Sequence, residues 1–126
     1  NPFSFGGTQN DRFDPASPGI VRLTRHPLLL ALGIWSAAHI LPNGDLAHVI
    51  LFGTFAGFAM LGGRLVDRRR QREMGQRWHD LRAALSECPA SLSLTTDTLL
   101  RLAAGLMLYA GLIWLHPLVI GVDPLV

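Results

Sequence analysis

The stretch from Leu46 to Leu65 constrains the fold of this chain more than any other feature. Only two of its side chains, His48 and Arg64, are ionisable. At about 1.5 Å of rise per residue, a helix of this length spans roughly 30 Å, which is the thickness of the hydrocarbon core of a bilayer. A segment that is apolar over such a length is typical of a membrane-spanning helix.

Two further apolar segments lie on either side of it. The earlier one is short and would span about 22 Å as a helix, and the turn-forming residues Pro42–Asp45 join it to the central segment as a hairpin. Hydrophobic residues make up 49% of the whole chain, as expected for a membrane protein. We therefore predict an all-α integral membrane protein, in which an irregular lead-in at residues 1–19 precedes a single membrane domain at 20–126. Its three transmembrane helices are expected at about 27–42, 46–65 and 98–120.

The basic residues, all of which are arginines, predict the orientation of these helices. Arg22 and Arg25 precede the first apolar segment, and most of the others follow the second, between Arg64 and Arg82. Because positive charge favours the cytoplasmic side, we expect the N-terminus and residues 66–98 in the cytoplasm. The hairpin turn and the C-terminus would then lie on the opposite side of the membrane. The formal net charge is only +2, so nothing indicates nucleic-acid binding.

Part of the cytoplasmic segment has the pattern of an amphipathic helix. Its apolar side chains recur at helical spacing, with charged residues between them, at Met74, Trp78, Leu81 and Leu85. This pattern predicts a helix at about 67–87 lying in the membrane interface. The alternative is a charged connector exposed to solvent.

Three histidines are predicted to lie at one depth of the membrane. His39 precedes the hairpin turn by three residues, and His48 follows it by three. His116 lies near the end of the third helix, which emerges on the same side, whereas His26 lies on the opposite side. Histidines from neighbouring helices can ligate haem iron or a Zn or Cu ion. Alternatively, they mark only where the helices reach the lipid headgroups.

Other candidate residues have more general roles. Gly53 and Gly57 have the G-x-x-x-G spacing of helix packing in lipid. Asp45 precedes the second helix and is expected to cap its N-terminus, and Asp67 is expected to form an ion pair among the arginines. A cytoplasmic site for an anion or a lipid headgroup is predicted at Arg22, Arg25 and Arg68.

Four segments of the chain form a specific pattern, namely GIVRLTRHP, WSAAHILPNGDLAHVILFG, DRRR and LHPLVIGVDPLV. Through them the chain resembles the C-terminal half of the NnrU family of bacterial membrane proteins, over nearly all of residues 19–126. The resemblance implies the bacterial inner membrane, with the C-terminus on the periplasmic side. Members are associated with nitrogen-oxide metabolism and denitrification, and the family is similar to the plant 15-cis-ζ-carotene isomerase, which uses haem b. The resemblance implies haem b held by His26, His39 or His116, and an isomerase-like or redox role. It also implies further membrane helices in an N-terminal half that precedes these residues.

A more distant resemblance is to the isoprenylcysteine and phospholipid methyltransferases. It rests on Arg25-His26-Pro27, followed by Gly75, Trp78 and Pro89. Three hypotheses about function therefore remain open: a haem-dependent membrane protein, a methyltransferase-like protein, and a non-catalytic subunit that packs in a larger complex through Gly53 and Gly57. The expected partners are membrane lipids, together with other membrane subunits or the missing N-terminal half.

Overall fold

The computed structural model describes residues 1–5, 10–88 and 95–124. All elements within these residues are helical, which confirms the predicted all-α class. Two short 3-10 helices, η1 (Asn10–Arg12) and η2 (Gly19–Arg22), lie in and after the lead-in. The α-helices are α1 (Pro27–Ile40), α2 (Leu46–Met74), α3 (Gln76–Glu87) and α4 (Thr96–Ile120). By their internal contacts the residues form two compact units, Asn1–Ser91 and Leu92–Val126, and each is described by itself.

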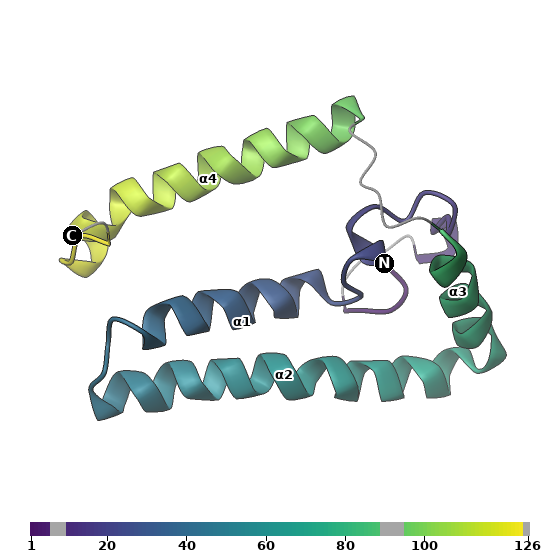
Figure 1. Ribbon diagram of the computed structural model, residues 1–126, viewed down its shortest axis with the longest axis horizontal. Helices are drawn as coiled ribbons and strands as arrows, with labels where there is room; N and C mark the ends of the chain where they lie inside the picture. The colour runs from purple at the N-terminus through teal and green to yellow at the C-terminus, as the bar shows by residue number, and fades with distance from the viewer. Residues whose placement is uncertain (6–9, 89–94, 125–126) are drawn as a thin grey trace. The chain divides into compact units, whose positions relative to one another are not determined.

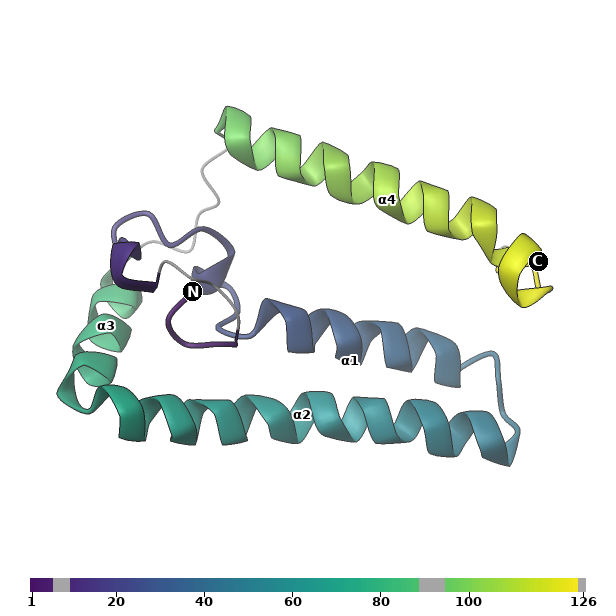
Figure 2. The ribbon, with the colours of Figure 1, turned by 180° about the vertical axis from the view of Figure 1, so that it is seen from behind.

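Helices α1 and α2 form the predicted hairpin and lie side by side along the whole of α1 (Figures 1 and 2). Pro27 occupies the first turn of α1, where its missing N–H costs no hydrogen bond. Asp45 caps α2 as predicted, since its carboxylate accepts hydrogen bonds from the backbone N–H groups of Ala47 and His48 at 3.1 and 3.2 Å. The turn between the helices is therefore fixed by the local sequence.

The two helices approach each other at glycines other than the predicted pair. A Cβ atom on Gly33 would lie 3.5 Å from Ala59, and one on Gly62 would lie 3.4 Å from Leu29. At Gly53 and Gly57, by contrast, an added Cβ would meet nothing within 4 Å. These two glycines do not pack against α1, and their predicted contact with another subunit stays a prediction.

Helix α2 is longer than its apolar segment. The sequence placed a helix end near residue 65 and a new helix at about 67–87, whereas the structure has one helix through Met74 and another from Gln76. Arginine, glutamine and glutamate are good helix formers, so the change from apolar to charged residues does not end the helix. The break comes at Gly75, whose φ of 57° is a conformation that glycine adopts readily.

Two helices, α2 and α4, are long and apolar enough to cross a membrane, and α1 is apolar but shorter, at 14 residues. Thr95 caps the N-terminus of α4, since its hydroxyl accepts a hydrogen bond from the N–H of Thr98 at 3.2 Å. It ends before Gly121, which has a φ of 84°. Large apolar side chains are exposed all along α4, as expected for a helix that contacts lipid.

A small hydrophobic core covers the charged end of the hairpin. Phe3, Val21, Trp78 and Leu85 are buried against one another, and Phe13, Met74 and Leu81 pack on them. The apolar side chains of the predicted interfacial helix therefore pack on Phe3, Phe13 and Val21, and a position of this helix in the membrane interface stays a prediction. Burial of a large apolar side chain contributes about 1.5–3 kcal/mol, so covering this face within the chain is more favourable than leaving it in solvent.

Candidate functional site

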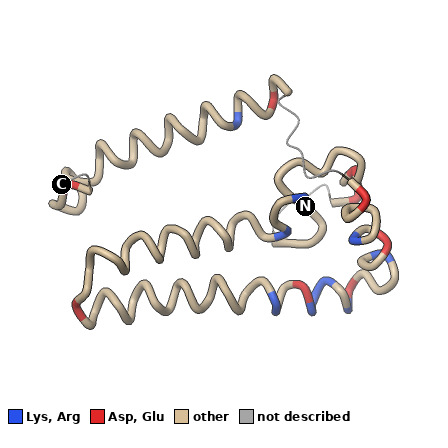
Figure 3. Tube along the Cα trace, in the orientation of Figure 1, with Lys and Arg blue, Asp and Glu red and all other residues tan. Residues whose placement is uncertain are grey.

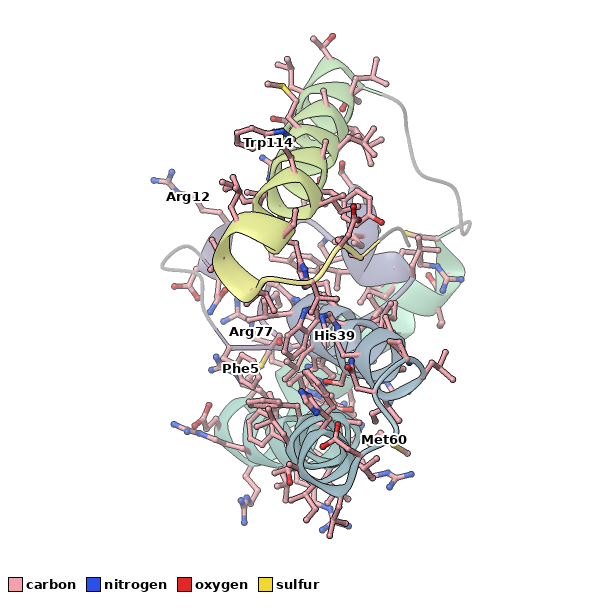
Figure 4. All side chains as sticks on the ribbon, turned by 90° about the vertical axis from the view of Figure 1, so that its left-hand side faces the viewer. Phe5, Arg12, His39, Met60, Arg77 and Trp114 are labelled. Carbon is pink, nitrogen blue, oxygen red and sulfur yellow. The ribbon has the colours of Figure 1, made fainter. Side chains whose placement is uncertain are left out.

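The turn end of the hairpin carries an aromatic cluster that contains two of the predicted histidines. The imidazole of His39 lies 4.6 Å from the ring of Trp35 and 4.9 Å from that of Phe52, between centroids. His48 stacks on Phe52 at 6.0 Å with an interplanar angle of 19°. Each helix contributes a pair of residues four positions apart, which places both members on one face. Figure 4 views the molecule from this end, with His39 labelled.

In this cluster the Nδ1 atom of each imidazole has a hydrogen-bond acceptor. His39 Nδ1 lies 2.8 Å from the backbone oxygen of Trp35, and His48 Nδ1 contacts the carboxylate of Asp45. Because both partners are acceptors, Nδ1 carries the hydrogen and donates it. In a neutral imidazole the lone pair is then on Nε2, which is the form that binds a metal or haem iron.

Asp45 is suited to hold His48 in this form. The backbone N–H of His48, followed by its imidazole, lowers the pKa of the Asp45 carboxyl below its usual value. The group is therefore a carboxylate at neutral pH. A carboxylate that accepts the Nδ1 hydrogen of a ligand histidine fixes the orientation of the ring and raises the basicity of Nε2.

His116 has the same local arrangement in the second unit. Its Nδ1 lies 2.7 Å from the backbone oxygen of Val122, just beyond the end of α4. This carbonyl is again an acceptor, so Nδ1 donates the hydrogen here too. Pro117 follows within the helix and lacks the N–H that would otherwise complete the last turn.

His26 lies at the other end of the hairpin and has partners at both nitrogens. Its Nδ1 is 3.2 Å from the hydroxyl oxygen of Ser4, and its Nε2 is 3.1 Å from a carboxylate oxygen of Asp67. Arg25 donates to the same carboxylate at 3.3 and 2.7 Å, which confirms the predicted ion pair of Asp67. The imidazole rests on Gly63, where an added Cβ would lie 3.3 Å from His26 Cδ2. This histidine thus joins the lead-in to both helices.

The three residue types of this network, serine, histidine and aspartate, are also those of an acyl-transfer triad. In that chemistry the serine hydroxyl must be reached by a substrate. Ser4 is only 3% exposed, and Arg70 donates a hydrogen bond to its backbone oxygen at 3.0 Å. The geometry therefore fits a structural junction.

The three arginines of the predicted anion site have different surroundings. Arg22 donates to the backbone oxygen of Cys88 at 2.8 Å, and Arg25 is bound to Asp67. Arg68 is exposed on α2. Two of the three guanidinium groups thus have partners within the chain, and the site itself stays a prediction.

Sequence reasoning missed Ser4 and the direct contact between His26 and Asp67. The sequence did contain a pattern that indicates the contact. Pairing residues outward from the turn of the antiparallel hairpin places His39 beside His48, and the same pairing places His26 beside the charged end of the second helix. For Ser4, no pattern in the sequence indicated a partner.

A comparison with families of known proteins supplies the remaining observation. The model of the family described as NnrU protein matches residues 3–124, which include all four candidate histidines. The chain belongs to the NnrU family. The predicted resemblance to NnrU proteins is therefore confirmed. No curated protein and no solved structure matches the chain.

Proposed function

We propose that this NnrU-family chain is a haem-binding protein of the bacterial inner membrane. Helices α2 and α4 have the length and composition of membrane spans. Helix α1, at about 21 Å, would be the third span, since it pairs with α2 along its whole length. Charged residues gather at the lead-in end of the hairpin and on α3 (Figure 3), which supports a cytoplasmic position for that end and a periplasmic one for the turn.

The observation that carries the haem proposal is the hydrogen bonding of His39 and His48. Both Nδ1 atoms donate to acceptors at the turn end of the hairpin, and the two rings pack on the same buried phenyl group of Phe52. These two imidazoles, in apolar and aromatic surroundings, would hold the iron of a porphyrin. His116 lies in the other unit, and its role as a ligand stays a prediction from the sequence.

The protein residues have separate roles in such a site. Asp45 and the backbone oxygen of Trp35 would orient the two imidazoles. Phe52, which is buried, and Trp35 would provide apolar packing around the porphyrin. When bound, haem would supply the redox or isomerase-like chemistry that the family resemblance implies, in a role linked to nitrogen-oxide metabolism.

The other two hypotheses have less support in the geometry. In the methyltransferase-like motif, Arg25 and His26 both pair with the carboxylate of Asp67. Their polar groups therefore have partners within the chain. A non-catalytic subunit remains the alternative, because Gly53 and Gly57 lie on a face that no other described residue covers closely.

Visible spectroscopy of the chain purified in mild detergent tests the proposal. We expect a Soret band that shifts on reduction with dithionite, and its loss in His39→Ala or His48→Ala. His79→Ala is the matched control, because His79 lies on α3 with a side-chain partner, Gln71, far along the chain from the turn. A folded protein that leaves the absorption spectrum of added hemin unchanged would contradict the haem proposal and favour the subunit hypothesis.

A further inference from the structure

The arginines that follow the apolar part of α2 fall into two groups. Arg69 and Arg70 are paired with Glu73, at 2.7 and 3.1 Å. The second group, defined here as the arginine row, makes no hydrogen bond or ion pair with any part of the chain that the structure describes. It consists of Arg64, Arg68 and Arg72.

The arginine row lies on one face of the helix. Its members are four residues apart, so successive Cα atoms are separated by about 6 Å along the axis and the row extends over about 12 Å. All three residues are exposed. Three guanidinium groups on one face, with no carboxylate to neutralise them, form a binding surface for negatively charged oxygens.

The surface continues toward the apolar part of the helix. Met60 and Leu61, one turn before Arg64, are 72% and 57% exposed, and Met60 is labelled in Figure 4. Arg64 lies about 27 Å along the helix from Leu46, close to the thickness of a hydrocarbon core. A ligand that matches this face therefore has an anionic head beside the arginines and an apolar tail beside Met60 and Leu61.

We propose that the arginine row binds the phosphate of an anionic phospholipid at the edge of the membrane. This inference rests on the membrane placement of α2 proposed above and is independent of haem. Arg64, at the hydrocarbon edge, extends its side chain toward the headgroups to contact the phosphate. Arg68 and Arg72 contact the phosphate from within the headgroup region. Charge and apolar surface together favour a lipid over free phosphate, which has no tail, and over an acidic protein segment, which would not require the exposed apolar turn.

Native mass spectrometry of the full chain, titrated with phosphatidylglycerol in neutral detergent, tests this site. The variant Arg64→Gln/Arg68→Gln/Arg72→Gln is expected to bind phosphatidylglycerol about tenfold more weakly than the unmodified chain. Its control is Arg69→Gln/Arg77→Gln/Arg101→Gln, which removes the same charge from arginines that have carboxylate partners. The control is expected to retain the affinity, and phosphatidylcholine is expected to bind weakly and equally to all three proteins.

Three results would overturn the proposal. The first is an equal loss of phosphatidylglycerol affinity in the two triple variants. The second is equal affinity of the unmodified chain for phosphatidylcholine and phosphatidylglycerol. The third is displacement of bound phosphatidylglycerol by millimolar inorganic phosphate. Helical content, measured by circular dichroism, checks that the variants are folded. If the triple variant does not fold, Arg68→Gln against Arg69→Gln provides the same comparison. An unchanged Soret band in the variants would separate this result from the haem proposal.

Discussion

The two ends of the α1–α2 hairpin contain the same residue types in different arrangements. At the turn end, His48 contacts Asp45 through Nδ1 alone. At the lead-in end, His26 is bound through both nitrogens, to Ser4 and Asp67, and only 12% of its side chain is exposed. His26 is therefore tied to two other segments of the chain, whereas His48 contacts the cap of its own helix, which is why we propose His48, and not His26, as a haem ligand.

The largest effect is expected from removing the carboxylate at the lead-in end. Asp67→Ala leaves Arg25 and His26 without their shared partner in a partly buried position, so the free energy of unfolding should fall by about 2–3 kcal/mol. Denaturant unfolding in detergent, followed by circular dichroism, measures this. The Soret absorbance per amount of folded protein should be unchanged. A loss of haem without a loss of stability would reverse the roles assigned to the two ends.

Adding a side chain to α2 should destabilise the protein only on the face that packs against His26 and α1. Gly63→Val places its side chain against the His26 ring, with the Cβ at 3.3 Å, and should lower the free energy of unfolding by about 1–2 kcal/mol. Gly57→Val, where a Cβ meets nothing within 4 Å, should change it by less than about 0.5 kcal/mol. Thermal unfolding of the two variants makes the comparison. Equal destabilisation would mean that Gly57 also lies in a packed contact.

A smaller effect is expected at the turn end from a change that keeps the shape of the side chain. Asp45→Asn removes the charge that orients His48 and should weaken haem affinity about tenfold. Titration of the purified chain with hemin measures the affinity. The control Asp97→Asn removes a carboxylate paired with Arg101 on α4 and should leave haem affinity unchanged. An unchanged affinity in Asp45→Asn would argue against His48 as a ligand.

The smallest effect concerns pH. Because the pKa of Asp45 is lowered in the folded chain, its contribution to stability is present above the usual pKa of an aspartate, about 3.9, and is lost as the pH falls through the lower folded value. The unmodified chain should therefore be more stable than Asp45→Asn at neutral pH, and the difference should disappear in strong acid. Melting temperatures measured from pH 7 downward test this. If the difference in melting temperature between the unmodified chain and Asp45→Asn grows as the pH falls through the range in which aspartate titrates, the prediction is contradicted.

Local features of the fold were predictable from individual residues. The hairpin followed from Pro42–Asp45 between two apolar segments, and the cap at Asp45 followed from its position before Leu46. The length of α2 was predicted less well. Hydropathy indicates where the apolar part of a helix ends, whereas the helix itself can continue through charged residues, as α2 does to Met74. The end of α2 depended on the backbone of Gly75.

The sequence alone determined the helical class, the family, the apolar spans and the placement of His39 beside His48. These depend on composition and on spacing along one or two helices, which a linear pattern contains. Only the tertiary structure decided that His26 bonds to Ser4 and Asp67, that the lead-in covers Trp78 and Leu85, and that Arg64, Arg68 and Arg72 have no partner among the described residues. Those outcomes depend on contacts between residues far apart in the chain, where hydrogen-bond geometry and burial select one set of partners among many that the sequence would allow.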